Sequence, residues 1–161
     1  MRFSTLASIT TLLASASKVA ALGELAFNIG VKNNDGTCKS TSDYESELQV
    51  LKSYTSTIKV YAASDCNTLQ NLGPAAEAEG FSVFVGVWPN DDAHFQAEQD
   101  ALSAYLPTIK TDTVAGFLVG SEALYRDDLT ASQLADKINT VRSLIGGISC
   151  LLYTSPSPRD A

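Results

Sequence analysis

The stretch Thr113-Val-Ala-Gly-Phe-Leu-Val-Gly-Ser-Glu-Ala-Leu-Tyr-Arg126 decides the fold, because it joins an apolar strand to a polar loop. Residues 114–119 are apolar in succession, which is typical of a strand covered on both faces in a parallel sheet. The run stops at Gly120, and the carboxylate of Glu122 follows. Loops at the carboxyl ends of parallel strands build active sites in α/β enzymes, so Glu122 is the leading catalytic candidate.

Glu122 also has a purely structural explanation. Ser121 could cap a following helix, and Glu122 could lie in its first turn, where the helix dipole favours an acid. The choice between a catalytic and a structural role for Glu122 depends on the rest of the chain.

Three similar segments precede this strand at intervals of roughly thirty residues, which is the length of a βαβ step. Apolar and β-branched residues predict strands at 25–31, 57–62, 81–88 and 114–119. Segments with helical periodicity lie between them, so the chain alternates strand and helix. A TIM (β/α)8 barrel needs about 250 residues. The α/β pattern of four units therefore predicts the N-terminal half of such a barrel.

Start signals predict where the helices lie. Two capping boxes predict helices at 43–53 and 131–144. The boxes are Ser42 with Glu45 and Thr130 with Gln133. A third helix is predicted to begin near Asp91. The second helix is predicted at 68–79, although Gly73-Pro74 breaks its pattern.

The N-terminal segment has the pattern of a secretory signal peptide. Arg2 is followed by an apolar stretch and by small residues before a predicted cleavage after Ala21, with Ala20 as the alternative. The segment 1–21 is too short and too rich in Ser and Thr for a membrane span. It predicts a secreted protein.

The C-terminal segment 150–161 shares neither the acidity nor the periodicity of the preceding chain. It looks like translated adapter or vector sequence, so we expect a non-native tail there and a barrel half that spans 22–149. A Pro/Ser-rich disordered tail is the alternative interpretation.

The charge balance narrows the class of ligand. Lys and Arg number 11 against 18 Asp and Glu, which gives a formal net charge of −7. Nucleic acid and anionic lipid are not expected as partners, because both bind to basic patches. A neutral ligand such as a sugar is compatible with this charge.

The cysteines and the single histidine do not indicate a metal site. Cys38, Cys66 and His94 lack the spacing of metal ligands, so no metal or other cofactor is expected. In an oxidising compartment Cys38 and Cys66 could pair, but the sequence does not give the distance between them. His94 is predicted to be a surface residue of the third helix.

Polar and aromatic residues follow all four predicted strands. In chain order they include Asn28, Tyr61 with Asp65, Trp88 and Glu122. The carboxyl ends of parallel strands meet at one edge, so these side chains are expected to form one ring. Aromatic rings stack on sugar faces and polar groups bind hydroxyls, which predicts a carbohydrate site. Taken singly, Trp88 could be a core residue and Asp65 a helix cap.

The strand ends lie within four longer motifs. They are FNIGVKNNDGTC at 27–38, VYAASDCNTLQ at 60–70, VGVWP at 85–89 and VGSEALYR at 119–126. These motifs closely resemble the fungal cell-wall branch of glycoside hydrolase family 17, and the resemblance covers 22–147. It implies a secreted cell-wall enzyme of the β-1,3-glucanase or glucanosyltransferase type, with a (β/α)8 barrel, a retaining mechanism and β-1,3-glucan as substrate.

The resemblance also implies roles for single residues. Glu122 matches the general acid/base of the family, and Tyr61 matches a tyrosine that lines the cleft. Ser121 stands where plant members usually carry an Asn before this Glu. Further residues expected to line or support the cleft are Trp88, Tyr125 and Asn28.

The nucleophile of the family is a second Glu at the end of strand 7, which has no counterpart here. One carboxylate cannot both protonate the leaving oxygen and attack the anomeric carbon, so the 161-residue chain is expected to be an inactive fragment of an active protein. Its bare sheet edges predict self-association. Hydrolysis and glucanosyl transfer both stay open. The alternatives are a noncatalytic glucan-binding wall protein and a truncated barrel of another sugar-active family.

Overall fold

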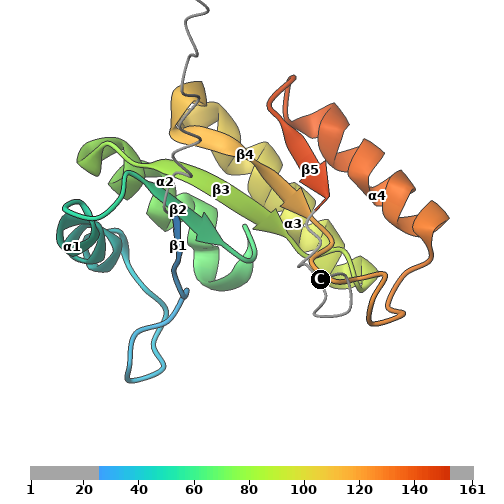
Figure 1. Ribbon diagram of the computed structural model, residues 1–161, viewed down its shortest axis with the longest axis horizontal. Coiled ribbons are helices and arrows are strands. Elements are labelled where there is room, and N and C mark those ends of the chain that lie inside the picture. Colours follow the sequence, from blue (N-terminus) through green and yellow to red (C-terminus); the bar gives the residue numbers. More distant parts are fainter. Residues whose placement is uncertain (1–25, 153–161) are drawn as a thin grey trace, which may run out of the picture.

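The computed structural model describes residues 26–152, so the predicted signal segment 1–21 and residues 153–161 of the predicted tail lie outside the described residues. Five parallel strands form one sheet, in the same order as along the chain (Figure 1). The strands are β1 (Ala26–Asn28), β2 (Thr57–Val60), β3 (Ser82–Val87), β4 (Val114–Val119) and β5 (Cys150–Leu152). Each strand therefore pairs with its neighbour in the sequence, as expected of consecutive βα units.

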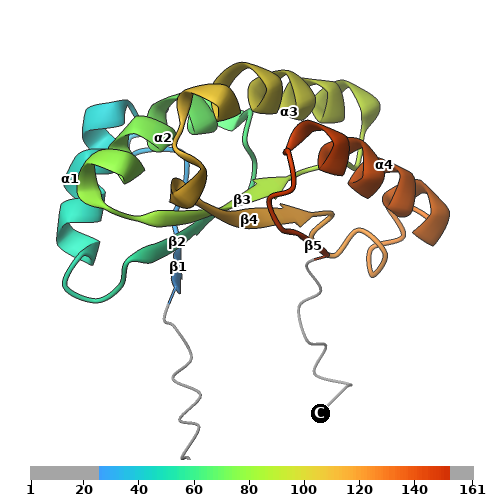
Figure 2. The same cartoon turned by 90° about the horizontal axis from the view of Figure 1, so that it is seen from above.

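Four α-helices alternate with the strands. They are α1 (Thr41–Leu51), α2 (Thr68–Glu79), α3 (Asp92–Tyr105) and α4 (Ala131–Leu144). Short 3-10 helices flank α2 and α3, at η1 (Asp65–Asn67), η2 (Leu106–Thr108) and η3 (Thr111–Thr113). Figure 2 shows all four α-helices on one face of the sheet. The predicted alternation of strand and helix is confirmed.

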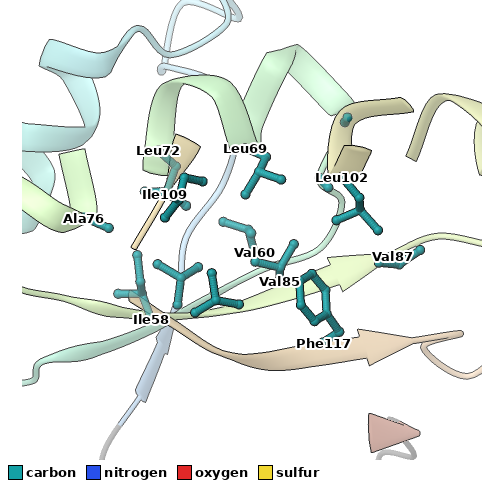
Figure 3. Packing of buried hydrophobic residues seen from close by; sticks show 14 of the residues in the cluster. Ile58, Val60, Leu69, Leu72, Ala76, Val85, Val87, Leu102, Ile109 and Phe117 are labelled. Atoms are coloured by element: carbon teal, nitrogen blue, oxygen red, sulfur yellow. The ribbon is translucent and has the colours of Figure 1, made fainter. Parts of the chain in front are cut away.

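The hydrophobic core lies between the sheet and these helices. Successive strand residues face opposite sides of the sheet, so alternate side chains meet the helices. Figure 3 shows Ile58, Val60, Val85, Val87 and Phe117 from the sheet and Leu69, Leu72, Ala76, Leu102 and Ile109 packed against them. Fully burying one such aliphatic side chain contributes about 1.5–3 kcal/mol. This layer therefore fixes the strand ends, and with them the loops that follow.

Strand β5 corrects the expected number of strands. Cys150–Leu152 pairs with β4 in parallel, and the amide of Phe117 donates to the carbonyl of Ser149 at 2.8 Å. The free edge of β4 offers unpaired backbone groups that any short extended segment can satisfy. The segment predicted to be a tail thus begins within the sheet. Its non-native origin stays a prediction.

The start of α1 also differs from the prediction. The cap is Ser40, whose hydroxyl accepts from the amide of Asp43 at 3.3 Å, while the Asp43 carboxylate accepts from the amide of Ser40 at 2.8 Å. The sequence holds two overlapping boxes, because Ser42 with Glu45 has the same spacing. The upstream box forms the cap, so α1 begins at Thr41, two residues before the predicted start at residue 43. At the other predicted box, Thr130 with Gln133 caps α4 as expected.

Helix α2 has the predicted bounds and continues through Pro74, where the pattern is broken. Proline removes one backbone donor, but the apolar face of the helix is buried on both sides of it, at Leu72 and Ala75. Packing of this face against the sheet outweighs the lost hydrogen bond.

Candidate active site

The carboxyl ends of the strands place the predicted site residues along one edge of the sheet. Asn28 ends β1, Tyr61 follows β2, Trp88 follows β3, and Ser121 with Glu122 follows β4. The ends of β3 and β4 are joined directly, because the amide of Gly120 donates to the carbonyl of Val87 at 3.2 Å. Glu122 and Trp88 therefore follow adjacent, hydrogen-bonded strand ends.

Glu122 lies in a tight turn with an unusual backbone. Gly120 has a φ of +73° and Glu122 a φ of +55°, both in the left-handed region. This conformation costs a residue with a side chain about 1–3 kcal/mol, and such strain is concentrated at functional sites. The alternative in which Ser121 caps a helix is wrong, because α4 begins only at Ala131. The turn leaves the Glu122 side chain half-buried at the sheet edge.

Arg126 binds the Glu122 turn to the loop after β3. Its guanidinium lies 4.7 Å from the centroid of the Trp88 ring and donates to the carbonyl of Ser121 at 3.3 Å. It also donates through Nε to Asp128 at 2.9 Å, and Asp128 accepts from the side chain of Asn90 at 2.5 Å. The structure thus brings Trp88 and Ser121 together around one cation.

Tyr61 presents its ring at the same edge, with 47% of the residue exposed. The ammonium of Lys59 lies 4.9 Å from the centroid of this ring, and burial lowers the pKa of Lys59. The next strand makes room for the Tyr61 backbone, because a Cβ on Gly86 would overlap the Tyr61 carbonyl. The side chain of Tyr61 is therefore exposed, whereas its backbone is closely packed against β3.

Tyr125 and Asn28 are also exposed. Tyr125 lies in the loop that carries Glu122 and is 80% exposed, and Asn28 is exposed at the end of β1. Both are open to a ligand at the carboxyl edge.

A disulfide joins Cys38 to Cys66, with their Cα atoms 5.2 Å apart. It ties the loop between β1 and α1 to the loop between β2 and α2. Within residues 26–152, no three His, Cys, Asp or Glu side chains cluster so that they could hold a metal ion. None of the helices in this part of the chain is long and apolar enough to cross a membrane.

His94 is not the plain surface residue that the sequence suggests. Only 26% of its side chain is exposed, and its Nε2 lies 3.1 Å from Asp65 Oδ1 and 3.2 Å from Glu98 Oε1. Glu98, one helical turn further along α3, is fully buried. His94 therefore belongs to a partly buried polar cluster.

Sequence reasoning missed Arg126 and Glu98. Arg126 stands four residues after Glu122, but its contact with Trp88 depends on how two separate loops fold. Glu98 did leave a signal, because it is an acid within the apolar stripe of α3, three residues after Phe95 and four before Leu102. A charge on the buried face of a helix needs specific partners.

The model of the family described as Glycosyl hydrolases family 17 matches residues 25–158. The chain belongs to this family. Among its family 17 relatives, a glucan 1,3-beta-glucosidase of Saccharomyces cerevisiae is 76% identical over 151 residues, which are 92% of this chain and 48% of that protein. A glucan 1,3-beta-glucosidase of Candida albicans is 64% identical over 140 residues, covering 87% of this chain and 46% of that protein.

Two solved structures from Rhizomucor miehei share the fold. A family 17 β-1,3-glucanosyltransferase aligns with a TM-score of 0.73 and 30% identity, over 81% of this chain and 49% of that one. An active-site mutant of a β-1,3-glucanosyltransferase in complex with laminaritriose aligns with a TM-score of 0.72 and 32% identity, over 79% and 48%. The chain spans about half the length of the curated relatives it matches. The predicted fold class, an N-terminal half of a TIM barrel, is confirmed.

Proposed function

We propose that this chain is the N-terminal half of a retaining glycosidase that acts on β-1,3-glucan, with Glu122 as general acid/base. The observation that carries this proposal is the place of Glu122, in a strained turn at the carboxyl end of β4, where Arg126 of the same loop lies over the Trp88 ring. The names of the family 17 relatives, which include glucan 1,3-beta-glucosidases and a glucanosyltransferase studied with laminaritriose, support the substrate class.

The chemistry needs two carboxyl groups about 5 Å apart. Glu122 protonates the glycosidic oxygen as the bond to the anomeric carbon breaks, while a second carboxylate forms the covalent glycosyl enzyme. Glu122 then takes a proton from the water or sugar hydroxyl that attacks this intermediate. We assign the nucleophile to the part of the barrel of its relatives that this chain does not span. In the experiments below, "complete enzyme" means a protein in which the barrel units of this chain are followed by the remaining units of the barrel.

The aromatic residues supply the glucan-binding cleft in this proposal. The faces of Tyr61 and Trp88 stack on glucose rings, and Arg126 keeps the Trp88 ring beside the Glu122 turn. Tyr125, Ser121 and Asn28 add polar groups for the sugar hydroxyls. Water or a second glucan chain resolves the intermediate, so hydrolysis and transfer use the same residues. The segment 1–21 directs the protein to secretion, and the cell wall holds its substrate.

The proposal is tested by Glu122→Gln in the complete enzyme, with laminarin as substrate. We expect kcat to fall by about 10²–10⁴-fold, the range for loss of general acid–base catalysis. Binding of laminaritriose should be retained, since the amide keeps the shape of the side chain. Asp127→Asn is the matched control, because it removes a neighbouring exposed carboxylate from the same loop.

Two further outcomes separate the alternatives. If Glu122→Gln and the unsubstituted enzyme bind laminaritriose equally and neither turns over laminarin, a noncatalytic glucan-binding role replaces the enzyme. The isolated 161-residue chain should release no sugar from laminarin, and cleavage by it would contradict the assignment of the nucleophile to the other half.

A further inference from the structure

Glu98 is a buried carboxylate that the proposed mechanism does not use. Its side chain, on α3, is 0% exposed. Among the buried residues of the described chain it is the only acid. A carboxylate is costly to remove from water unless its oxygens accept hydrogen bonds, so its burial points to specific partners.

Those partners lie in the loop between β2 and α2. Glu98 Oε2 accepts from the backbone amide of Ala63 at 2.7 Å, and Oε1 accepts from the hydroxyl of Ser64 at 2.9 Å. Burial raises the pKa of Glu98 to about 7, while these hydrogen bonds oppose the rise. Glu98 thus ties α3 to a loop that is 34 and 35 residues away in the sequence.

His94, one turn before Glu98, lies against the same loop. Its Nε2 lies between the carboxylates of Glu98 and Asp65, and Asp65 begins η1 just after Ser64. The disulfide at Cys66 anchors the following residue. The loop is therefore held from Ala63 onward by α3 and by the covalent bond.

Tyr61 lies on the short segment between these anchors and the sheet. Val60 is fixed in β2 and Ala63 is fixed by Glu98, so two residues separate the fixed points. The Tyr61 side chain is half-exposed, and its carbonyl sits against Gly86. The direction of this half-exposed side chain depends on the backbone on both sides, together with the Lys59 ammonium that lies 4.9 Å from the ring centroid.

We propose that Glu98 is the positioning residue of the β2–α2 loop: its carboxylate fixes Ala63 and Ser64 so that the Tyr61 ring faces the glucan. This inference rests on the proposed function, because it takes Tyr61 as a residue of the glucan-binding cleft. Glu98 acts through the loop and does not touch the sugar. Loss of Glu98 should therefore weaken binding more than it slows the chemical step.

The first test compares Glu98→Leu with Glu98→Gln in the complete enzyme. Leucine leaves the Ala63 amide without its acceptor, and we expect the KM for laminarin and the Kd for laminaritriose to rise about tenfold, with kcat changed less than about threefold. Glutamine still offers an oxygen to the Ala63 amide, so it should restore most of the affinity. A role confined to stability would lower the melting temperature and leave KM unchanged at 25 °C, which would overturn the proposal.

The second test combines Glu98→Leu with Tyr61→Ala. If Glu98 acts through Tyr61, the double variant binds laminaritriose no more weakly than Tyr61→Ala alone, whereas additive losses would overturn the proposal. Should Glu98→Leu fail to fold, Ser64→Ala takes its place, and an unchanged Kd for that variant would count against the proposal. Laminaritriose binding reports on the loop even in an enzyme that does not turn over laminarin. Laminarin turnover thus tests the proposed catalysis, and laminaritriose binding tests the role of Glu98.

Discussion

At the scale of single residues, the site depends on two glycines that make room for neighbours. Gly120 adopts a left-handed conformation that starts the turn leading to Glu122. Gly86 lies in β3 against the backbone of Tyr61 and Val60, where a Cβ would overlap both carbonyl groups. Neither residue can contact a sugar through a side chain, yet both determine where the contacting residues stand.

Gly86→Ala should therefore destabilise the complete enzyme by about 1–3 kcal/mol, the usual cost of overpacking. The added methyl group would meet backbone, which cannot move aside as a flexible side chain can. Urea denaturation measures the change in the free energy of unfolding. Gly30→Ala is the control, because a Cβ there meets no atom within 4 Å. Equal effects of the two substitutions would contradict the close approach of β2 and β3.

At the scale of elements, α1, α3 and α4 each begin where a side chain accepts from one of the first free amides, whereas α2 follows η1 without a side-chain cap. Asp91 caps α3, accepting from the amide of His94 at 2.7 Å, and Thr130 caps α4. In α1 the Ser40 box competes with the overlapping box at Ser42. The Ser42 hydroxyl lies 3.0 Å from the Ser40 hydroxyl. The backbone carbonyl of Ser42 accepts from the hydroxyl of Ser46.

Ser40→Ala should lower the free energy of unfolding by about 1 kcal/mol, as typical for loss of a helix N-cap. Ser42→Ala should change it by less than about 0.5 kcal/mol, because Ser42 lies within the helix and is exposed. Thermal denaturation of both variants, made in the complete enzyme, gives the comparison. The reverse order would show that α1 starts at the downstream box.

At the scale of the whole molecule, the sheet resembles a barrel that is open on one side. Helices cover one face of it (Figure 2), and among residues 26–152 the strands β1 and β5 each pair on one edge only. Unpaired strand edges bind other strand edges. The open edges of β1 and β5 could therefore pair with the same edges of another copy of the chain.

We expect the isolated 161-residue chain to form dimers or larger species, whereas the complete enzyme closes the barrel on itself. Size-exclusion chromatography with light scattering over a range of protein concentrations measures this. Cys150→Ser is included as a control, because Cys150 has a free thiol that could link two chains covalently. A monomer at every concentration would contradict the expectation.

Local patterns in the sequence were enough to predict most of the fold. The strands at β2, β3 and β4 and the positions of Tyr61, Trp88 and Glu122 at their ends follow from apolar runs and from what interrupts them. Three features were out of reach because they depend on distant partners. Strand β5 forms on the edge of β4, Arg126 meets Trp88 across two loops, and the partner of Glu98 is the Ala63 amide in the β2–α2 loop.

The coincidence of strand order and chain order has a consequence for biosynthesis. Each new strand can add to the sheet as it leaves the ribosome, since its partner has already been made. Nascent chains of this family can therefore acquire structure in one direction, from the amino terminus onward. The loop that carries Glu122 would then be formed before translation reaches the part of the barrel that we assign to the nucleophile.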